Sequence, residues 1–376
     1  MANTLSNIMP KILASGLRVL REQARMPRLV NGDYSTDAAE KGDTIDVPVS
    51  KAVTSYDIAP TAHQATAADT TPGKVQIPLD NWRGASFYLT DKDMKEIDRN
   101  RHFLPLQGAE AVRSLANDVN SDVMLEYKGV YGYASAPDAV FASSVKAATE
   151  VRKVLNSQLC PRDSRRGVVN YDAEANMLAL AQFSDVEKVG ESAPKIEGEI
   201  GRKYGIDWYT DDDVKTHTNG TAWALGCTVG STTAAGASTL KIKSSSAGTA
   251  LVGDIFTIAG DTQTYVVTAS TNLTSTGVDV TIDPPLKAIA TTADALAVKA
   301  SHVANLAFHR EAFALAMRPL AGVTETNPYV MAMQDAQTGL TLRLEVTRQN
   351  KQDKWDFDVL WGAKLVEARM AARIPG

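Results

Sequence analysis

The sequence predicts an α+β protein that carries a small inserted β module, and three stretches support this prediction. Leu340 to Trp361 alternates apolar with polar side chains over most of its length, as strands with one buried face do. Leu104 to Tyr127 places apolar side chains three and four positions apart, as in a helix that covers a sheet. Thr221 to Val303 contains neither Arg nor Glu and is dominated by Thr, Ser, Ala and Gly, which indicates a unit of different composition.

Length and composition are those of an ordinary globular protein with room for two or three units. The chain has 376 residues, of which 44% are hydrophobic and 22% charged, and its formal net charge is -5 at pH 7. A dedicated nucleic-acid-binding protein usually shows a clustered basic face, so this charge balance argues against that class. Incidental contact with nucleic acid through local patches remains open.

The two cysteines, Cys160 and Cys227, lie far apart in segments of different composition. This arrangement argues against a disulfide framework and against a thiolate metal site. The N-terminal segment lacks an apolar core of the signal-peptide kind, and no apolar run is long enough to span a bilayer. We therefore expect folding in a reducing cytoplasm and no membrane partner.

Apolar residues from Leu5 to Leu20 recur at helical spacing, which predicts an amphipathic N-terminal helix. Pro10 is expected in the first turn of that helix or at its start, because proline lacks the N–H that an interior turn uses. The apolar stripe could dock on its own subunit or on a neighbouring one, and the pattern does not choose between them.

Strands are expected at Thr44 to Val49, Val75 to Leu79 and Ser86 to Leu89. The segment Ser50 to Lys74 is rich in Ala, Thr and Asp and poor in large apolar residues. A connection this long in a compact protein is either functional or without fixed structure. We interpret it as an extended arm that reaches a neighbouring molecule, with plain disorder as the alternative.

Residues 130–220 alternate helical and strand patterns. Asp172 is expected to cap a helix that runs through Ala181, since its side-chain oxygen can accept a hydrogen bond from a first-turn amide. The other elements expected here are a helix at Val145 to Leu159, a strand at Gly167 to Asn170, and a strand at Glu199 to Tyr209 that glycines interrupt.

Short strand patterns recur inside the inserted module, at Leu240 to Lys243, Ile255 to Ile258, Thr264 to Thr268 and Val278 to Ile282. Beyond the module, Asn305 to Met317 is strongly apolar and Tyr329 to Gln337 leads into a closing hairpin. This hairpin is expected to turn through a polar connector, Arg348 to Lys354. Its apolar face needs a cover, and the helix at Leu104 to Tyr127 is the candidate.

Side chains suited to catalysis or metal binding form no recognisable motif. The five histidines share no metal-ligand spacing, although His302 and His309 could share a helix face. Asp211 to Asp213 beside His217 is the strongest cluster, and a hydrolase that uses it is one rival hypothesis. Three consecutive acids point in different directions, so a solvated turn is favoured. Because phosphate-binding loops and nucleophile elbows are also missing, we expect no enzyme activity and no catalytic, cofactor-binding or metal-binding residues.

The order of these pieces resembles a known family. The N-terminal helix, the long loop and the long helix are followed by Arg165 to Asn170 and its helix, by the run Asn305 to Arg310, and by the hairpin Thr338 to Gly362. Together they are similar to the major capsid proteins of tailed phages with the Hong Kong-97-type fold. The resemblance is to the short-tailed-phage coat group with an inserted β-domain, and it covers nearly the whole chain.

The resemblance implies five parts. These are an N-terminal arm helix (1–43), an extended loop with its strands (44–89), a peripheral domain with a spine helix and the C-terminal hairpin (90–129 and 321–376), an axial domain (130–220 and 304–320), and an inserted β-domain (221–303). It further implies pentamers and hexamers of this chain, assembled in the host cytoplasm into the icosahedral head of a virion. Scaffolding protein, portal protein and packaged double-stranded DNA would be its partners, with no cofactor.

Candidate contacts between subunits follow from these parts. They are Leu5, Ile12, Lys51, Tyr56, Lys74, Trp82, Arg83, Arg348, Lys351 and Lys354. The arm is too short to contain the cleaved N-terminal segment of some relatives, which implies a separate scaffolding protein. Some relatives link a loop lysine to an asparagine of the next subunit. Lys51 and Lys74 lie in the corresponding stretch, but we do not expect this cross-link.

The main rival is a secreted or surface carbohydrate-binding β protein, which the Thr- and Ser-rich module suggests. Two observations argue against it: the sequence shows no secretion signal, and only 6% of the residues are aromatic.

Overall fold

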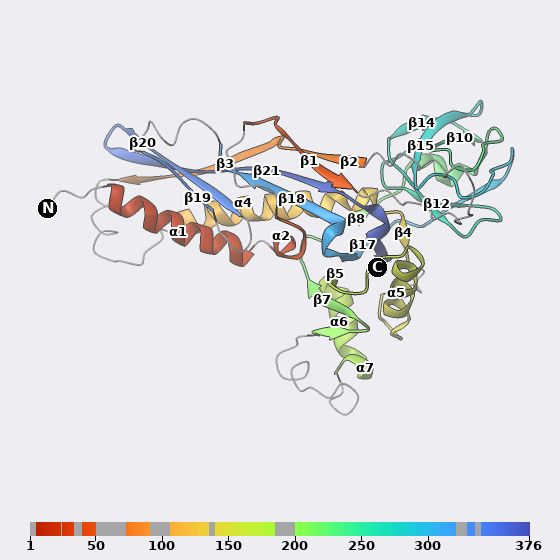
Figure 1. Cartoon of the computed structure of the whole chain (residues 1–376), viewed down its shortest axis with the longest axis horizontal. Coiled ribbons are helices and arrows are strands. Elements are labelled where there is room, and N and C mark those ends of the chain that lie inside the picture. The colour runs from red at the N-terminus through yellow and green to blue at the C-terminus, as the bar shows by residue number, and fades with distance from the viewer. Residues whose placement is uncertain are drawn as a thin grey trace, which may run out of the picture. The chain divides into compact units, whose positions relative to one another are not determined.

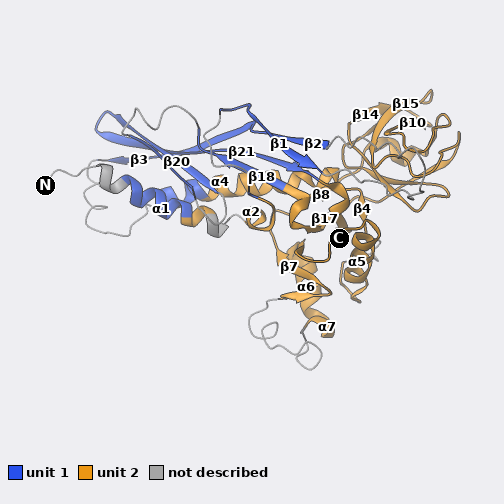
Figure 2. Cartoon of the chain, viewed as in Figure 1, with its two compact units in different colours: residues 1–17, 32–112, 314–366 blue, residues 18–31, 113–313, 367–376 orange. Residues whose placement is uncertain are grey.

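The structure, a computed structural model, describes residues 5–23, 25–33, 40–49, 73–90, 106–134, 140–184, 200–320, 329–334 and 340–376. The chain forms two units, each built from segments that are far apart in the sequence (Figure 2). Unit 1 comprises Met1–Leu17, Gly32–Val112 and Ala314–Val366, and unit 2 comprises Arg18–Asn31, Arg113–Phe313 and Glu367–Gly376. None of the described helices has both the length and the apolar character needed to cross a membrane.

The centre of unit 1 is a five-stranded sheet with the order β18-β21-β20-β19, in which β3 also pairs with β21 (Figure 1). Alternate residues of the two longest neighbours are buried, namely Leu342, Leu344 and Val346 in β20 and Trp355, Phe357, Val359 and Trp361 in β21. The strands are β3 (Asn81–Thr90), β18 (Phe313–Arg318), β19 (Val330–Gln334), β20 (Thr341–Gln349) and β21 (Gln352–Leu365).

The closing hairpin is confirmed, but its turn is shorter than expected. Gln349 of β20 faces Gln352 of β21, so Asn350 and Lys351 alone form the turn, with φ angles of 31° and 67°. We expected residues 348–354 to be a polar connector. Most of them instead continue the two strands, because a two-residue turn with positive φ matches the twist of the flanking strands and lets their pairing run to the tip.

The N-terminal helix α1 (Leu5–Gln23) docks on its own chain, which decides between the two alternatives left open by its pattern. Gly16 lets the helix approach the sheet of unit 1 closely. A Cβ built at Gly16 lies 3.1 Å from Leu342 Cδ2 and 3.5 Å from Phe357 Cε1. The buried stripe consists of Met9, Ile12, Leu13, Leu17 and Leu20.

Pro10 lies inside α1 rather than in its first turn, which corrects the expectation. The proline removes one backbone hydrogen bond of the helix. Burial of the stripe outweighs this loss, since each large apolar side chain contributes about 1.5–3 kcal/mol when it leaves water.

Strands β1 (Thr44–Val49) and β2 (Gly73–Pro78) form an antiparallel pair in unit 1. Ile45, Val47 and Ile77 on this pair pack with Leu360 of β21. The third expected strand is also present, as part of the longer β3. Apart from its end in β2, the expected extended arm at residues 50–74 lies outside the described residues.

The expected long helix is confirmed as α4 (Leu106–Leu125), which continues as the 3-10 helix η1 (Glu126–Gly129). Its buried residues include Val112, Leu115, Ala116, Val119, Val123, Met124 and Tyr127. We expected this helix to cover the closing hairpin. In unit 1 it is α1 that packs on the hairpin, where a Cβ built at Gly16 lies 3.1 Å from Leu342 Cδ2, and this Cβ also lies 3.4 Å from Val112 Cγ2 of α4.

Unit 2 contains a seven-stranded sheet with the order β4-β22-β17-β5-β7-β6, in which β8 also pairs with β17. Pairing is parallel between β5 and β7 and between β22 and β4, and antiparallel on both sides of β17. The strands are β4 (Gly132–Tyr133), β5 (Arg165–Val169), β6 (Arg202–Lys203), β7 (Ile206–Thr210), β8 (Thr216–His217), β17 (His302–His309) and β22 (Ala371–Pro375).

The C-terminal end differs from the expected division. We expected residues 321–376 to form one part with the long helix and residues 304–320 to form another. Instead Glu367–Gly376 belongs to unit 2, where the 3-10 helix η4 (Ala368–Met370) leads into β22 beside β17. Residues 314–320 belong to unit 1. An apolar run shows that a strand is buried, but it does not show which sheet the strand joins.

The helices of unit 2 also refine the expected pattern. Asn170, and not Asp172, caps α6, since the Asn170 side chain accepts a hydrogen bond from Ala173 N at 3.1 Å. The strand expected at 199–209 is a hairpin of β6 and β7 that turns at Tyr204 and Gly205, with φ angles of 55° and 80°. The helices are α2 (Met26–Leu29), α5 (Lys146–Ser157), α6 (Tyr171–Ala179) and α7 (Ala181–Ser184).

The inserted module is a closed barrel with the order β10-β15-β13-β12-β16-β9 and a core of its own (Figure 1). All four expected strands are present, as β10 (Thr239–Ser244), β12 (Ile255–Ile258), β13 (Thr264–Val267) and β15 (Val278–Asp283). The elements that were not expected are η2 (Thr221–Leu225), β9 (Cys227–Val229), β11 (Gly248–Ala250), β14 (Thr271–Leu273) and β16 (Ala295–Val298). They are short, so their alternation is too brief to stand out.

Candidate assembly surfaces and a buried polar cluster

One face of the unit 1 sheet carries polar side chains together with two exposed aromatic rings. Trp82 and Tyr88 of β3 are 46% and 48% exposed. In the strand register Trp82 lies opposite Leu360, and Tyr88 opposite Lys354. Exposed aromatic side chains beside charged ones are typical of protein interfaces, so we call this the outer face and treat it as a candidate contact surface.

Charged residues of β20 and β21 form a ladder of ion pairs on the outer face. Arg343 lies 3.0 Å from Glu345 and 3.6 Å from Asp358, and Lys354 lies 2.9 Å from Asp356. Burial raises the pKa of Asp358 to about 6, and Arg343 opposes this shift. The side-chain hydrogen bond and charge of Asp356 raise the pKa of Lys354.

The tip of the hairpin is a second candidate contact surface. Arg348 and Lys351 are exposed, and Arg348 forms an ion pair of 3.0 Å with Asp353. Since Asn350 and Lys351 form the turn itself, Lys351 lies exposed at the end of two paired strands. A basic group at such a position is available to a neighbouring molecule.

The structure places the expected contact residues in different settings. Trp82 and Lys354 lie on the outer face, and Arg83 is exposed on β3. Lys74 is exposed on β2 and pairs with Asp46 at 2.9 Å, and that contact lowers the pKa of Asp46.

The remaining expected contact residues are those of the arm and the loop. Leu5 lies at the start of α1, while Lys51 and Tyr56 lie outside the described residues. Ile12 is 2% exposed and packed within its own chain, so the expectation that it contacts a neighbour is corrected. Ile12 belongs to the stripe that docks α1.

Sequence reasoning did not single out Tyr88 or Asp358 on the outer face. The signal was present, because residues 355–361 alternate and the acids must face away from Trp355 and Phe357. The pairing of β3 with β21 was not visible in the pattern, and it is this pairing that brings Tyr88 beside Lys354.

The acidic triplet does not form a site with His217. Asp211 is buried, and its carboxylate accepts two hydrogen bonds from Asn120 Nδ2 at 3.1 Å and one from Asp213 N at 2.9 Å. Burial raises its pKa. His217 has a different acidic partner, Asp254. Asp211 therefore fastens the turn at residues 211–213 to α4, and because Asp211 is buried, the expectation of a solvated turn is corrected for this residue.

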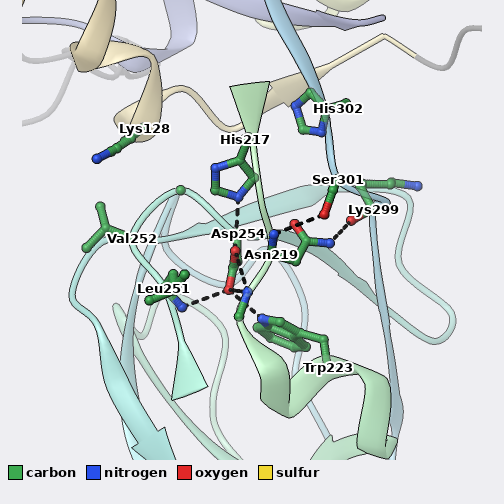
Figure 3. Close-up of polar contacts among 12 residues, drawn as sticks. Lys128, His217, Asn219, Trp223, Leu251, Val252, Asp254, Lys299, Ser301 and His302 are labelled. Carbon is green, nitrogen blue, oxygen red and sulfur yellow. Dashed lines mark hydrogen bonds and ion pairs between the residues drawn. The ribbon is translucent and has the colours of Figure 1, made fainter. Parts of the chain in front are cut away.

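His217 belongs to a buried polar cluster next to the barrel (Figure 3). At its centre is Asp254, which is fully buried. The Asp254 carboxylate accepts hydrogen bonds from His217 Nε2 at 2.9 Å, Trp223 Nε1 at 2.6 Å, Leu251 N at 2.7 Å and Gly220 N at 3.1 Å. Four hydrogen-bond donors offset the free-energy cost of removing a charged carboxylate from water.

Arg373 of β22 completes this cluster from the sheet of unit 2. Its guanidinium donates to the Gly253 carbonyl at 2.8 Å and to the Lys128 carbonyl at 3.1 Å, and lies 5.0 Å from the centre of the Tyr127 ring. Burial lowers the pKa of Arg373 to about 9. Tyr127 in turn lies with its hydroxyl 3.2 Å from His217 Nδ1.

The remaining described histidines occupy strand β17 rather than a helix, which corrects the expectation of a shared helix face. His302 is buried beside His217, with ring centres 5.7 Å apart. His309 Nδ1 accepts from Glu311 N at 3.2 Å and caps the 3-10 helix η3 (Arg310–Ala312). Across the described part of the chain, no group of three or more His, Cys, Asp or Glu side chains is placed to hold a metal ion.

The sequence matches no protein-family model and no curated protein. Solved structures do match. A chain in the capsid structure of the cyanophage P-SCSP1u is 12% identical, with a TM-score of 0.51 over 94% of this chain and 88% of that one. A Mycobacterium phage Che8 chain is 15% identical, with a TM-score of 0.49 over 93% of this chain and 90% of that one. A chain of the bacteriophage PhiM1 mature capsid is 10% identical, with a TM-score of 0.43 over 92% and 89%.

The chain shares the α+β fold of the cyanophage capsid chain. The likeness extends over nearly the whole chain, as the sequence resemblance implied, and it confirms the capsid fold that was expected.

Proposed function

We propose that this chain is a major capsid protein that assembles into the icosahedral head of a tailed phage and encloses double-stranded DNA. The observation that carries the proposal is the capsid fold shared over 94% of the chain. In this role the chain is a structural component of a virion and not an enzyme. It requires no cofactor, and it associates mainly with further copies of itself in pentamers and hexamers.

The physical basis of such a role is cooperative association through many moderate contacts. Closed symmetry repeats each contact around the shell, so contacts that are weak singly become strong in sum. Weak single contacts also allow errors to be corrected during assembly. The outer face with Trp82 and Tyr88, and the hairpin tip with Lys351, supply surfaces of this kind.

We assign the parts of the chain by the Hong Kong-97-type pattern. The five-stranded sheet and α4 form the peripheral domain, the seven-stranded sheet forms the axial domain, and the barrel is the inserted domain. The extended loop, expected at residues 44–89, is the part that overlaps a neighbouring subunit, and its residues 50–72 lie outside the described residues. Scaffolding and portal proteins assist assembly in the host cytoplasm, and packaged DNA is contacted without sequence preference through dispersed Arg and Lys.

Purified full-length protein tests the proposal directly. Analytical ultracentrifugation and negative-stain microscopy across salt and crowding conditions should reveal closed shells, sheets or rings of capsomers. A chain that stays monomeric under all of these conditions, with and without a scaffolding protein, would overturn the proposal.

The contact surfaces have a test of their own. Deleting residues 59–71 should leave a folded subunit with an unchanged thermal transition that no longer assembles. Lys351→Glu, which reverses the charge at the exposed hairpin tip, should slow assembly measured by light scattering. Lys287→Glu reverses the charge of an exposed lysine on the barrel and serves as the control. If deletion of 59–71 prevents folding, the loop assignment is wrong.

A further inference from the structure

The cluster around Asp254 attaches one loop of the barrel to the sheet of unit 2. We propose that His217, His302 and Arg373 form an acid-operated clasp. At neutral pH the clasp holds the barrel loop 251–254 against β8 and β22, and protonation of His302 releases this loop. The proposal concerns how the inserted barrel is fastened within the subunit, and it does not depend on the assignment of a capsid function.

The grip on the loop consists of two direct contacts. His217 Nε2 lies 2.9 Å from the Asp254 carboxylate, and Arg373 Nη1 donates to the Gly253 carbonyl at 2.8 Å. Gly253 has a φ of 99°, and a Cβ built there would lie 3.0 Å from His217 Cε1, so the loop backbone lies directly against the imidazole ring. Arg373 also donates to Lys128 O at 3.1 Å, which anchors the guanidinium to the end of η1.

His302 lies beside these contacts, and one of its ring nitrogens already has a hydrogen-bond partner. Its Nδ1 lies 2.8 Å from the Ala300 carbonyl, so Nδ1 carries the proton and donates it. Nε2 is buried and has no hydrogen-bond partner among the described residues. The ring centre lies 5.3 Å from that of Tyr133 and 5.7 Å from that of His217.

The charges that face His302 oppose its protonation. His217 faces it from β8 and Arg373 acts on it from β22, while Tyr133 of β4 presents a ring to it and has the Lys299 ammonium 5.6 Å from its centre. Asp254, the carboxylate of the cluster, already accepts four hydrogen bonds. Burial is the main reason that the pKa of His302 falls to about 4, and Arg373 and His217 lower it further.

A proton on His302 would therefore place a positive charge beside the Arg373 guanidinium, and Nε2–H would lack an acceptor among the described residues. The sign of the pH effect follows from the two pKa values, about 4 in the closed state and 6.5 as the ordinary value. An opened state that exposes His302 binds the proton more readily. Opening is thus favoured as the pH falls from 6.5 towards 4, by about tenfold per pH unit and about 100-fold in all.

Other contacts keep the barrel attached when the loop opens. Asn219 N donates to Ser301 Oγ at 3.1 Å and Asn219 Nδ2 to Lys299 O at 2.6 Å, which ties the two ends of the insert together (Figure 3). Tyr131, Ile255 and Val266 form an apolar cluster between the barrel and the rest of unit 2. Neither contact contains a group that titrates between pH 4 and 7, so both hold the barrel when the clasp opens.

Hydrogen exchange of the full-length protein tests the clasp. Exchange is followed by mass spectrometry at several pH values from 7 to 4, and each rate is divided by that of the unstructured peptide at the same pH. Peptides that cover residues 215–220 and 251–255 should lose protection by about 100-fold as the pH falls. Peptides from β10 and β15 of the barrel should keep theirs.

The variant His302→Asn retains a donor for the Ala300 carbonyl but cannot be protonated, so its loop should stay protected at pH 4. His309→Asn is the matched control, since it replaces another buried histidine of the same strand and should behave like the natural protein. Arg373→Lys keeps the charge but cannot hold both carbonyls, and it should loosen the loop already at pH 7.

An unchanged acid transition in His302→Asn would overturn the proposal. So would loss of protection across the whole barrel together with the loop, or a loop that stays protected at pH 4 in the natural protein.

Discussion

Asp358 illustrates how strand pairing sets the chemistry of a single residue. Alternation turns this acid away from the core, but the surrounding β3 and β20 still bury it and raise its pKa to about 6. The folded state therefore binds this proton more tightly than the unfolded state, whose pKa is about 3.8. Stability from this group is present at low pH and is lost as the pH rises from about 4 to about 6.

The substitution Asp358→Asn removes this effect. We expect it to raise the free energy of unfolding at pH 7 by about 1–3 kcal/mol and to flatten the pH dependence between about 4 and 6. Arg343 keeps an acidic partner, since Glu345 lies 3.0 Å away. Urea denaturation at pH 7 and pH 4.5 measures the difference.

The control is Asp356→Asn, which removes a partly exposed acid on the same face. Its ion pair with Lys354 is solvated, so the change should stay below about 1 kcal/mol. Destabilisation of Asp358→Asn at pH 7 would show that the pair with Arg343 outweighs the cost of burial.

At the scale of elements, the closing hairpin depends on its two-residue turn. Lys351 occupies a left-handed backbone conformation with a φ of 67°, which costs a residue with a Cβ more than it costs glycine. Lys351→Gly should therefore raise the free energy of unfolding by about 0.5–1 kcal/mol. Thermal denaturation measures this, with Gln352→Gly as the control that should destabilise, because Gln352 is already in β21. A less stable Lys351→Gly would contradict the turn assignment.

Close approach of two strands in unit 1 depends on Gly362 of β21. A Cβ built at this position would lie 2.1 Å from the carbonyl oxygen of Pro78 in β2, and backbone there cannot give way easily. Gly362→Ala should lower the free energy of unfolding by roughly 2–4 kcal/mol. Gly73→Ala is the matched control, because its nearest neighbouring atom is 3.8 Å away. Similar midpoints for the two variants in urea would count against this contact.

At the scale of the whole molecule, the barrel is inserted in the sequence of unit 2 but has a hydrophobic core of its own. Its strands close on one another, and its apolar interior, including Leu240, Phe256 and Tyr265, packs within the insert. A closed barrel leaves no strand edge unpaired, which favours independent folding.

We therefore expect residues 219–301 to fold when expressed alone. The segment should give dispersed amide signals by NMR and a cooperative thermal transition. Phe256→Ala in the same segment should lower the transition midpoint, since it removes a large buried side chain worth about 3–5 kcal/mol. A segment without cooperative melting would show that the barrel needs the clasp and the sheet of unit 2.

Several elements were predictable because local patterns carry them. The alternation around Phe357 predicted two paired strands, and the spacing of Val112 to Tyr127 predicted the long helix. The Arg- and Glu-free composition predicted the separate module. The buried polar cluster was not predictable, since Tyr127, His217, Asp254 and Arg373 come from segments up to 246 residues apart, as their positions in the chain show.

The sequence by itself determined the class of the fold, the strands of the closing hairpin, the buried faces of the chain's helices and the resemblance to phage capsid proteins. The first three follow from periodicity or composition within a short stretch, where local geometry fixes a side chain's neighbours, and the resemblance comes from the order of such stretches along the chain. Only the tertiary structure decided that α1 docks on its own chain, that β22 leaves the hairpin for the sheet of unit 2, and that His217 pairs with Asp254. These features depend on contacts between residues that are far apart in the sequence. The local pattern of each segment is compatible with several packing partners, so it does not show which one the segment contacts.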